Sequence, residues 1–204
     1  MVAFVAFIPV EEYLLYYRNA EKFIEFCKEC KSYGTCWACP PYDFNVAEVI
    51  SKYENAYIIG TKIIPDNTII NDVEQAKQAA HKLLAHARII LDERLLSLEK
   101  AYPNSRAFFA GTCFACPNES CTRIEGKPCI NPDKVRPSLE AFGFDIGKTT
   151  SDLLHIELKW SNNGFFPEYF MLVSGFFTNH QVKLGSIEVA IGKEYKRMIP
   201  YPLI

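Results

Sequence analysis

The chain has 204 residues, of which 49% are apolar, and a formal net charge of −2. This length and apolar content suffice for one hydrophobic core and predict a single domain over residues 1–204. The 22 basic residues are spread along the chain, without the basic cluster typical of proteins that bind nucleic acid. No stretch approaches the roughly 20 apolar residues of a membrane-spanning helix, so we expect a cytoplasmic protein without a membrane partner.

The first elements are predicted from hydrophobic periodicity. Residues 1–10 are apolar and predict a core strand, whereas the apolar residues of 11–30 recur at three- and four-residue intervals, as on a helix. Asn19 is the residue at which this helix is expected to restart. Asn45 with Glu48 forms a capping-box pattern, which predicts the start of the next helix.

The middle of the chain predicts a strand and a long helix. Residues 56–64 are apolar and rich in β-branched side chains, which is typical of a strand buried on both faces. Asn71 and Glu74 are expected to open the longest helix, which runs to about Lys100 with one apolar stripe. Strand and helix are therefore both predicted within the first hundred residues.

In the second half, two short helices and two strands are expected. Pro137 suits a first helical position and Gly143 a helix end, and a further helix is predicted over residues 145–153. Residues 154–160 and 169–177 are predicted to be strands. Together with the first half, this pattern predicts an α+β or α/β body that carries two cysteine-rich metal-binding loops.

These two loops are the first cysteine loop, residues 27–43, and the second cysteine loop, residues 111–132. Pro40 and Pro41 exclude regular structure in the first, and prolines with polar residues do so in the second. Each loop contains four cysteines at short intervals. The first quartet is Cys27, Cys30, Cys36 and Cys39, and the second quartet is Cys113, Cys116, Cys121 and Cys129.

The density of cysteines predicts metal coordination. In a reducing cytoplasm eight cysteines are poorly explained by disulfides, and a Cys-x2-Cys pair lets two thiolates converge from one turn of backbone. Zinc ribbons separate their pairs by roughly 12–20 residues, whereas the gaps within the quartets are much shorter. Short gaps favour two [4Fe-4S] clusters, with two zinc ions as the alternative.

Both quartets lie in segments that resemble a known family. Tyr33-Gly34, Trp37 and Cys39-Pro40-Pro41 in the first loop, and the run from Arg136 to Ala141 after the second, are similar to the predicted metal-binding proteins of anaerobic bacteria and archaea. The resemblance covers nearly the whole chain and implies metal binding without naming a reaction. In that family's pattern Cys36 is not usually a cysteine, whereas the spacing makes it the fourth ligand of the first quartet.

Other side chains near the loops are candidates for contact with the cofactor. Trp37 is expected to shield a cluster from water or to stack on a planar ligand, and Arg136 to place a cation beside the negatively charged thiolates. Arg123 and Lys127 are expected to be ordinary solvated charges, with a role as cations beside the cluster or in docking an acidic partner as the alternative.

Three functions therefore remain open from the sequence. The first is one-electron transfer between two clusters and a redox protein partner. The second is an enzyme in which one iron of the first cluster lacks a thiolate and binds a small substrate. The third is a zinc-stabilised interaction module.

Overall fold

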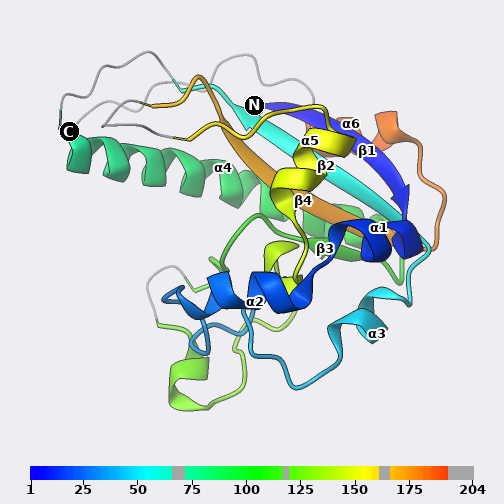
Figure 1. Cartoon of the computed structure of the whole chain (residues 1–204), viewed down its shortest axis with the longest axis horizontal. Helices are drawn as coiled ribbons and strands as arrows, with labels where there is room; N and C mark the ends of the chain where they lie inside the picture. Colours follow the sequence, from blue (N-terminus) through cyan, green and yellow to red (C-terminus); the bar gives the residue numbers. More distant parts are fainter. Residues whose placement is uncertain (66–71, 117–119, 161–165, 193–204) are drawn as a thin grey trace.

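The computed structural model describes residues 1–65, 72–116, 120–160 and 166–192 (Figure 1). Its four-stranded sheet consists of β1 (Val2–Pro9), β2 (Asn55–Ile63), β3 (Arg106–Phe108) and β4 (Phe170–Thr178), in the order β1-β2-β4-β3. The helices are α1 (Val10–Tyr17), α2 (Ala20–Lys28), α3 (Val46–Ile50), α4 (Val73–Ala101), α5 (Ile146–Leu153) and α6 (Leu184–Ile191), with 3₁₀ turns η1 (Thr122–Glu125) and η2 (Glu140–Phe142). Because each of its strand pairs is antiparallel, the fold is α+β, which confirms the mixed class predicted above.

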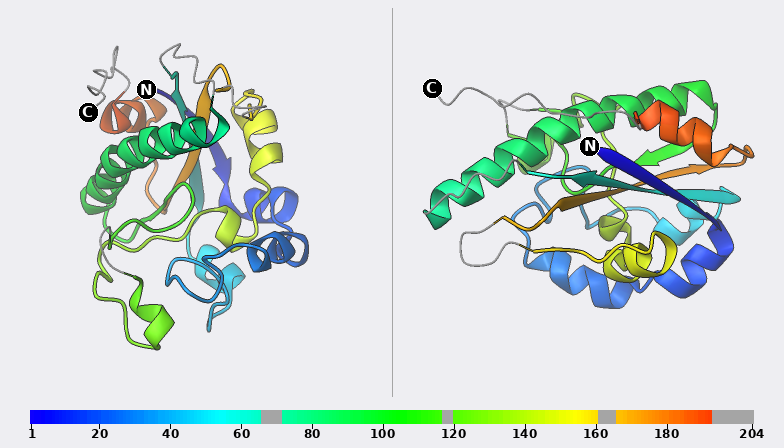
Figure 2. Two further views of the ribbon diagram at one scale, coloured as in Figure 1. Left: turned by 90° about the vertical axis from the view of Figure 1, so that its left-hand side faces the viewer. Right: turned by 90° about the horizontal axis from the view of Figure 1, so that it is seen from above.

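Helices cover both faces of the sheet (Figure 2). On one face, α4 and α6 pack side chains such as Leu91 and Ile187 against Ile59 of β2. On the other, α1 packs Tyr13 into a second core that includes Ile58 of the same strand. The alternation of Ile58 and Ile59 confirms that β2 is buried on both faces. In the described part of the chain, no helix combines the length and apolar character that crossing a membrane requires.

Polar side chains cap the starts of three helices in the first half of the chain, at or next to the predicted residues. Asn19 caps α2, and Asn45 caps α3 by accepting from the amides of Ala47 and Glu48. The Asn45 Nδ2 also donates to Glu48 Oε1 at 2.9 Å, a side-chain bond in place of the backbone bond of a complete capping box. The long helix α4 is capped by Asp72 rather than by Asn71, which lies outside the described residues. Local sequence signals thus locate these helix starts to within a residue.

The strand predicted at residues 154–160 is wrong. Leu154 and Ile156 pack on the core beneath the sheet instead of pairing with a strand, and His155 has a φ of 55°, outside the range of an extended chain. The apolar residues of this segment are therefore explained by packing against a face of the sheet. Three elements were not predicted at all: β3, which has three residues and hence no readable alternation, η1 within the second cysteine loop, and α6.

The helix predicted from Pro137 is shortened to η2. It ends at Gly143, whose φ of 87° is left-handed and whose added Cβ would lie 2.9 Å from the Cα of Ala20. The Gly143 carbonyl also accepts a hydrogen bond from the amide of Asn19 at 2.9 Å. This close approach holds the start of α2 against η2, and α2 in turn carries Cys27 at its end.

Candidate metal centre

The two cysteine loops lie against each other below the sheet (Figure 1). Trp37 of the first loop donates its Nε1–H to the carbonyl of Lys127 in the second, at 3.1 Å. Thr112 of the second loop donates its hydroxyl to Ser32 Oγ of the first at 3.3 Å. The contacts join residues that are 90 and 80 positions apart in the chain. Tertiary structure therefore brings both quartets into one region.

Arg123 makes the most extensive contact between the loops. Its Nη1 donates to the carbonyl oxygens of Cys36, at 2.8 Å, and of Cys39, at 2.5 Å, and its Nη2 donates to the carbonyl of Pro41. The guanidinium carbon lies 5.1 Å from the centre of the Trp37 ring, in a cation–π contact. The expectation that Arg123 is an ordinary solvated charge is therefore wrong, because its carbonyl partners come from a segment that no local signal connects to it.

The Cys-x2-Cys pairs of the first loop form tight turns, as their spacing predicts. The amide of Cys30 donates to the carbonyl of Cys27, and that of Cys39 to the carbonyl of Cys36, both at 3.0 Å. Cys27 lies in the last turn of α2, where burial, followed by the charges of Cys30 and Glu140, raises the pKa of its thiol.

The Cys36 thiol interacts with one thiol of each loop. The Cys36 side chain is buried, and hydrogen bonds donated by the thiols of Cys113 and Cys39 lower the pKa of its own thiol. The same bonds, followed by burial, raise the pKa of Cys39 and of Cys113. Thr112 Oγ1 lies 3.8 Å from Cys36 Sγ and 3.9 Å from Cys39 Sγ. Cys36 is thus the sulfur of this group that ionises first, and it lies where the quartets meet.

Within the second loop, Asn131 joins two cysteines that are 13 positions apart. Its side-chain Nδ2 donates to Cys116 Sγ at 3.2 Å, and its backbone amide donates to Cys129 Sγ at 3.4 Å. Cys113 Sγ accepts in the same way from the amide of Ala115, at 3.4 Å. Hydrogen bonds of this kind stabilise thiolates and tune the metal that they hold. The contacts of Asn131 with the cysteines were not predicted from the sequence, although its position two residues after Cys129 indicates that its amide can reach that sulfur.

A buried arginine positions the start of the second loop. Arg88 of α4 is 3% exposed, pairs with Asp92 at 2.9 Å, and donates to the carbonyls of Ala110 and Thr112. It therefore fixes the residues immediately before Cys113. This arginine lies among the apolar positions of α4 and was not predicted to have a role, because no local pattern distinguishes it from a solvated charge.

The donor set fits a metal held by thiolates. All eight cysteines are free thiols in this structure, so none is used in a disulfide. Three of the sulfurs accept N–H hydrogen bonds, as thiolate ligands do. Among the described residues, no set of three or more histidine, cysteine, aspartate or glutamate side chains is arranged around a single ion. The two quartets stay predictions as ligand sets, and Cys121, predicted to be part of the second, lies at the start of η1.

Arg136, predicted to lie beside the cofactor, forms an ion pair with Glu99 at the end of α4. The Nη2–Oε2 distance is 2.5 Å, and the side chains are only 17% and 11% exposed. Glu99 also accepts a hydrogen bond from the amide of Ala107 in β3, at 2.6 Å. The pair thus ties α4 and β3 to the segment that follows the second loop, and a contact of Arg136 with a cofactor stays a prediction.

Arg136→Ala is expected to lower the free energy of unfolding by about 3 kcal/mol, because it leaves the Glu99 carboxylate shielded from water without its ion-pair partner. The melting temperature should fall by roughly 6–12 °C while metal content stays unchanged. Lys159→Ala is the control, since its pair with Glu157 is more exposed and contributes little. Loss of metal at an unchanged melting temperature would instead place Arg136 at the cofactor.

Comparison with known proteins confirms the family resemblance. Neither the curated proteins nor the solved structures gave a match. A family model described as a predicted metal-binding protein (DUF2284) matches residues 16–174. The matched span includes both quartets, Arg123, Asn131 and the segment from Arg136 to Gly143. Because the match covers most of the sequence, the chain belongs to the predicted metal-binding protein family DUF2284.

Proposed function

We propose that the chain is an iron–sulfur protein in which each quartet holds one [4Fe-4S] cluster, and that it transfers single electrons to a redox protein partner in the cytoplasm. The observation that carries the proposal is the joining of two compact cysteine loops into one region by Arg123, Trp37 and Thr112. The clusters would supply the one-electron chemistry, and the protein residues would supply ligands, hydrogen bonds and shielding.

Clusters are favoured over zinc by the arrangement of the thiols. A zinc ion draws four donors to within about 2.3 Å of one point, usually from two knuckles that are well separated in sequence. In this chain, each quartet is confined to one short loop, where a cluster offers several iron atoms as separate attachment points. The N–H donors on Cys113, Cys116 and Cys129 are the kind that set cluster potentials.

The position of Cys36 supports electron transfer between the two centres. Its thiol interacts with Cys39 of its own loop and with Cys113 of the other, so predicted ligands of the two quartets lie close together. Clusters held by these ligands would be adjacent, which is the arrangement that favours rapid exchange of an electron. Trp37, which is 37% exposed, lies against the Arg123 guanidinium and would shield this side of the region from water.

Metal and sulfide analysis of protein purified without oxygen tests the proposal. We expect about eight irons and eight acid-labile sulfides per chain, together with a brown colour. Protein reconstituted with zinc alone provides the colourless control. About two zinc ions per chain without sulfide in the native protein would contradict the proposal and favour a zinc-stabilised interaction module.

A further inference from the structure

One edge of the sheet is open along the first half of β4. β2 pairs with β4 along its whole length, whereas β3 pairs only with residues 175–177. After β3 the chain turns away from the sheet, because the amide of Phe109 donates to the carbonyl of Pro137 at 3.0 Å. Within the described part of the chain, the backbone of residues 170–174 has no backbone partner beyond those in β2. This stretch of β4 therefore has one unpaired side.

The alternation along β4 identifies the backbone groups that face the unpaired side. The amide of Ala107 in β3 donates to a carboxylate of α4, so the neighbouring Phe108 is the residue that bonds to β4, opposite Gly175. The register between β2 and β4 is continuous, so no bulge interrupts the alternation. The N–H and C=O groups of Met171 and Val173 therefore point to the same side as those of Gly175, where the described residues form no strand.

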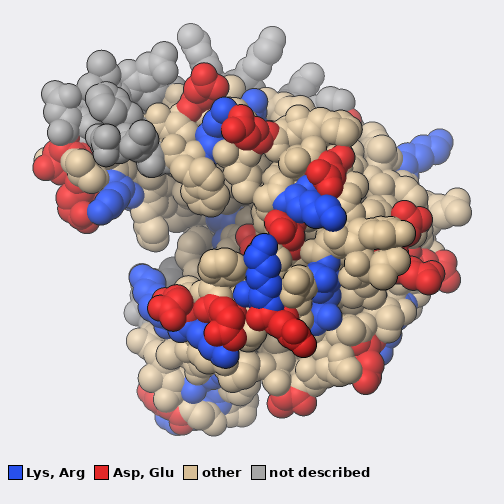
Figure 3. Space-filling model, in the orientation of Figure 1, with Lys and Arg blue, Asp and Glu red and all other residues tan. Residues whose placement is uncertain are grey.

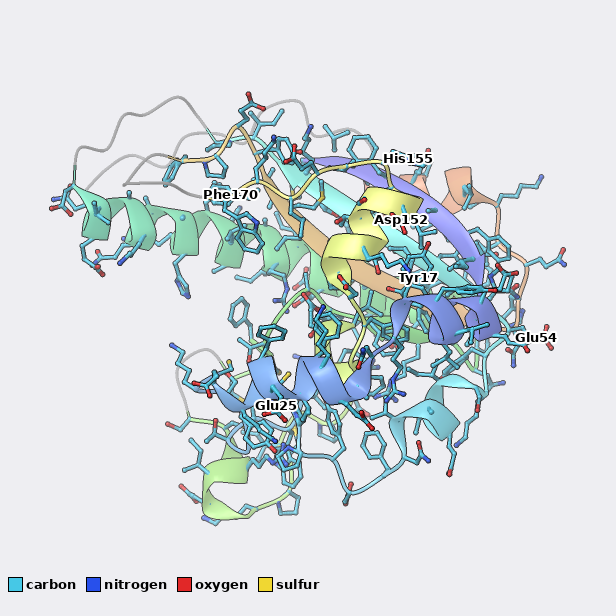
Figure 4. The ribbon with its side chains drawn as sticks, viewed as in Figure 1. Tyr17, Glu25, Glu54, Asp152, His155 and Phe170 are labelled. Carbon is cyan, nitrogen blue, oxygen red and sulfur yellow. The ribbon has the colours of Figure 1, made fainter. Side chains whose placement is uncertain are left out.

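A cavity of about 770 Å³ lies along this open edge and is lined by the four residues from Phe170 to Val173. Phe170, labelled in Figure 4, marks the start of the edge. Figure 3 shows the surface hollowed between α4 and the lower part of the molecule. Ala80 and Leu84 of α4 line the cavity on one face of the sheet, and Ile146 of α5 lines it on the other. A strand added here would therefore pack its alternate side chains on two apolar walls.

Basic and aromatic side chains complete the lining. Lys77 and His81 of α4 and Lys159 line the cavity, and each lysine pairs with a glutamate that is not part of the lining. Of the described lining residues, Glu140 is acidic, and burial raises the pKa of its carboxyl, which favours the neutral form. Trp160, also in the lining, is 79% exposed, and tryptophan is enriched at protein interfaces. The cavity is therefore complementary to an acidic partner.

We propose that the open edge of β4 binds an extended peptide segment of a partner protein as an added strand, with an acidic side chain of the peptide near the basic residues of the cavity. The main-chain groups of Met171 and Val173, spaced as in a β-ladder, supply affinity, and the two walls receive alternate side chains of the peptide. The proposal goes beyond electron transfer and does not depend on which metal the quartets hold. Binding is therefore measured separately from metal content.

Calorimetric titration of the metal-loaded protein with three matched peptides tests the proposal. The first is acetyl-Glu-Val-Ile-Val-Glu-amide, in which one carboxylate can reach the basic residues in either strand direction. The second is N-methylated at its three central residues and lacks their main-chain donors, and the third has lysine in place of both glutamates. We expect the second and the third to bind at least about tenfold more weakly than the first. No binding of the first peptide, or equal affinity for either of the others, would overturn the proposal.

Hydrogen exchange of the backbone amides locates the bound peptide. The amides of Met171 and Val173 are expected to exchange at least about tenfold more slowly in the complex, because each gains a main-chain acceptor. Unchanged exchange at both amides in the presence of bound peptide would place it elsewhere and overturn the proposal. Exchange that slows with protein concentration in the absence of peptide would assign the edge to a second copy of the chain and would also overturn it.

Two variants test the edge and the cavity separately. Met171→Pro removes a donor of the open side while leaving the hydrogen bonds to β2, since proline is tolerated where the amide faces away from the neighbouring strand. Ala80→Phe fills the cavity from α4. Each is expected to weaken the first peptide at least about tenfold, whereas Gln78→Phe, at an exposed position of α4 outside the lining, should not. If Met171→Pro fails to fold, the comparison of Ala80→Phe with Gln78→Phe decides alone, and unchanged affinity in Ala80→Phe would overturn the proposal.

Discussion

Cys36→Ala is expected to remove about half of the bound iron, four of the eight atoms that two four-iron clusters contain. The Cys36 thiol accepts hydrogen bonds from the thiols of Cys113 and Cys39, which lower its pKa, so its thiolate forms readily and is available to metal. Removing it deletes a ligand of the first quartet and the sulfur contact with the second. Iron and sulfide analysis of anaerobic protein, together with the electron paramagnetic resonance spectrum of the reduced protein, measures the effect.

Ser32→Ala is the matched control for Cys36→Ala. Ser32 lies in the same loop and accepts the Thr112 hydroxyl bond, but it has no sulfur to lose, so full iron content is expected. Full iron and sulfide in Cys36→Ala would contradict a ligand role for this cysteine. Combined with a spectrum of the unmodified protein that changes when an exogenous ligand is added, that result would favour an enzyme with an open iron over electron transfer.

Arg123→Ala is expected to separate the two cysteine loops without removing a thiol. The substitution leaves the carbonyls of Cys36, Cys39 and Pro41 without their charged donor and removes the cation from Trp37. Hydrogen bonds to charged groups contribute about 1.5–3 kcal/mol each and are not additive, so a loss of about 3 kcal/mol in local stability is expected. This corresponds to roughly a hundredfold faster release of metal to a chelator, if release requires the loops to part.

Lys127→Ala tests whether this effect requires the position of Arg123 or only a positive charge. Lys127 is in the same loop, but its ammonium pairs with Glu125 at the surface, with the two side chains 67% and 63% exposed. Its backbone carbonyl, which accepts the Trp37 hydrogen bond, is retained in alanine. We expect an unchanged rate of metal release, and equal acceleration in the two variants would show that the loops are joined by overall charge alone.

Much of the local structure could be predicted from the sequence. Helix starts at Asn19 and Asn45 are determined by side chains that bond to amides a few residues away, and β2 by a mainly apolar run rich in β-branched residues. The turns at Cys27–Cys30 and Cys36–Cys39 follow from their spacing. These features depend on neighbours within about four positions, which is the range over which periodicity and capping act.

Only the tertiary structure decided how these helices, strands and cysteine loops contact one another. The antiparallel order of the sheet brings residues 110–113 under α4, where Arg88 holds them, and the second loop against the first, where Arg123 reaches the carbonyls of Cys36 and Cys39. The pairing of Arg136 with Glu99 and the contact of Cys36 with Cys113 arise in the same way. Each joins residues tens of positions apart, and such contacts depend on chain topology, which local patterns of hydrophobicity and charge do not specify.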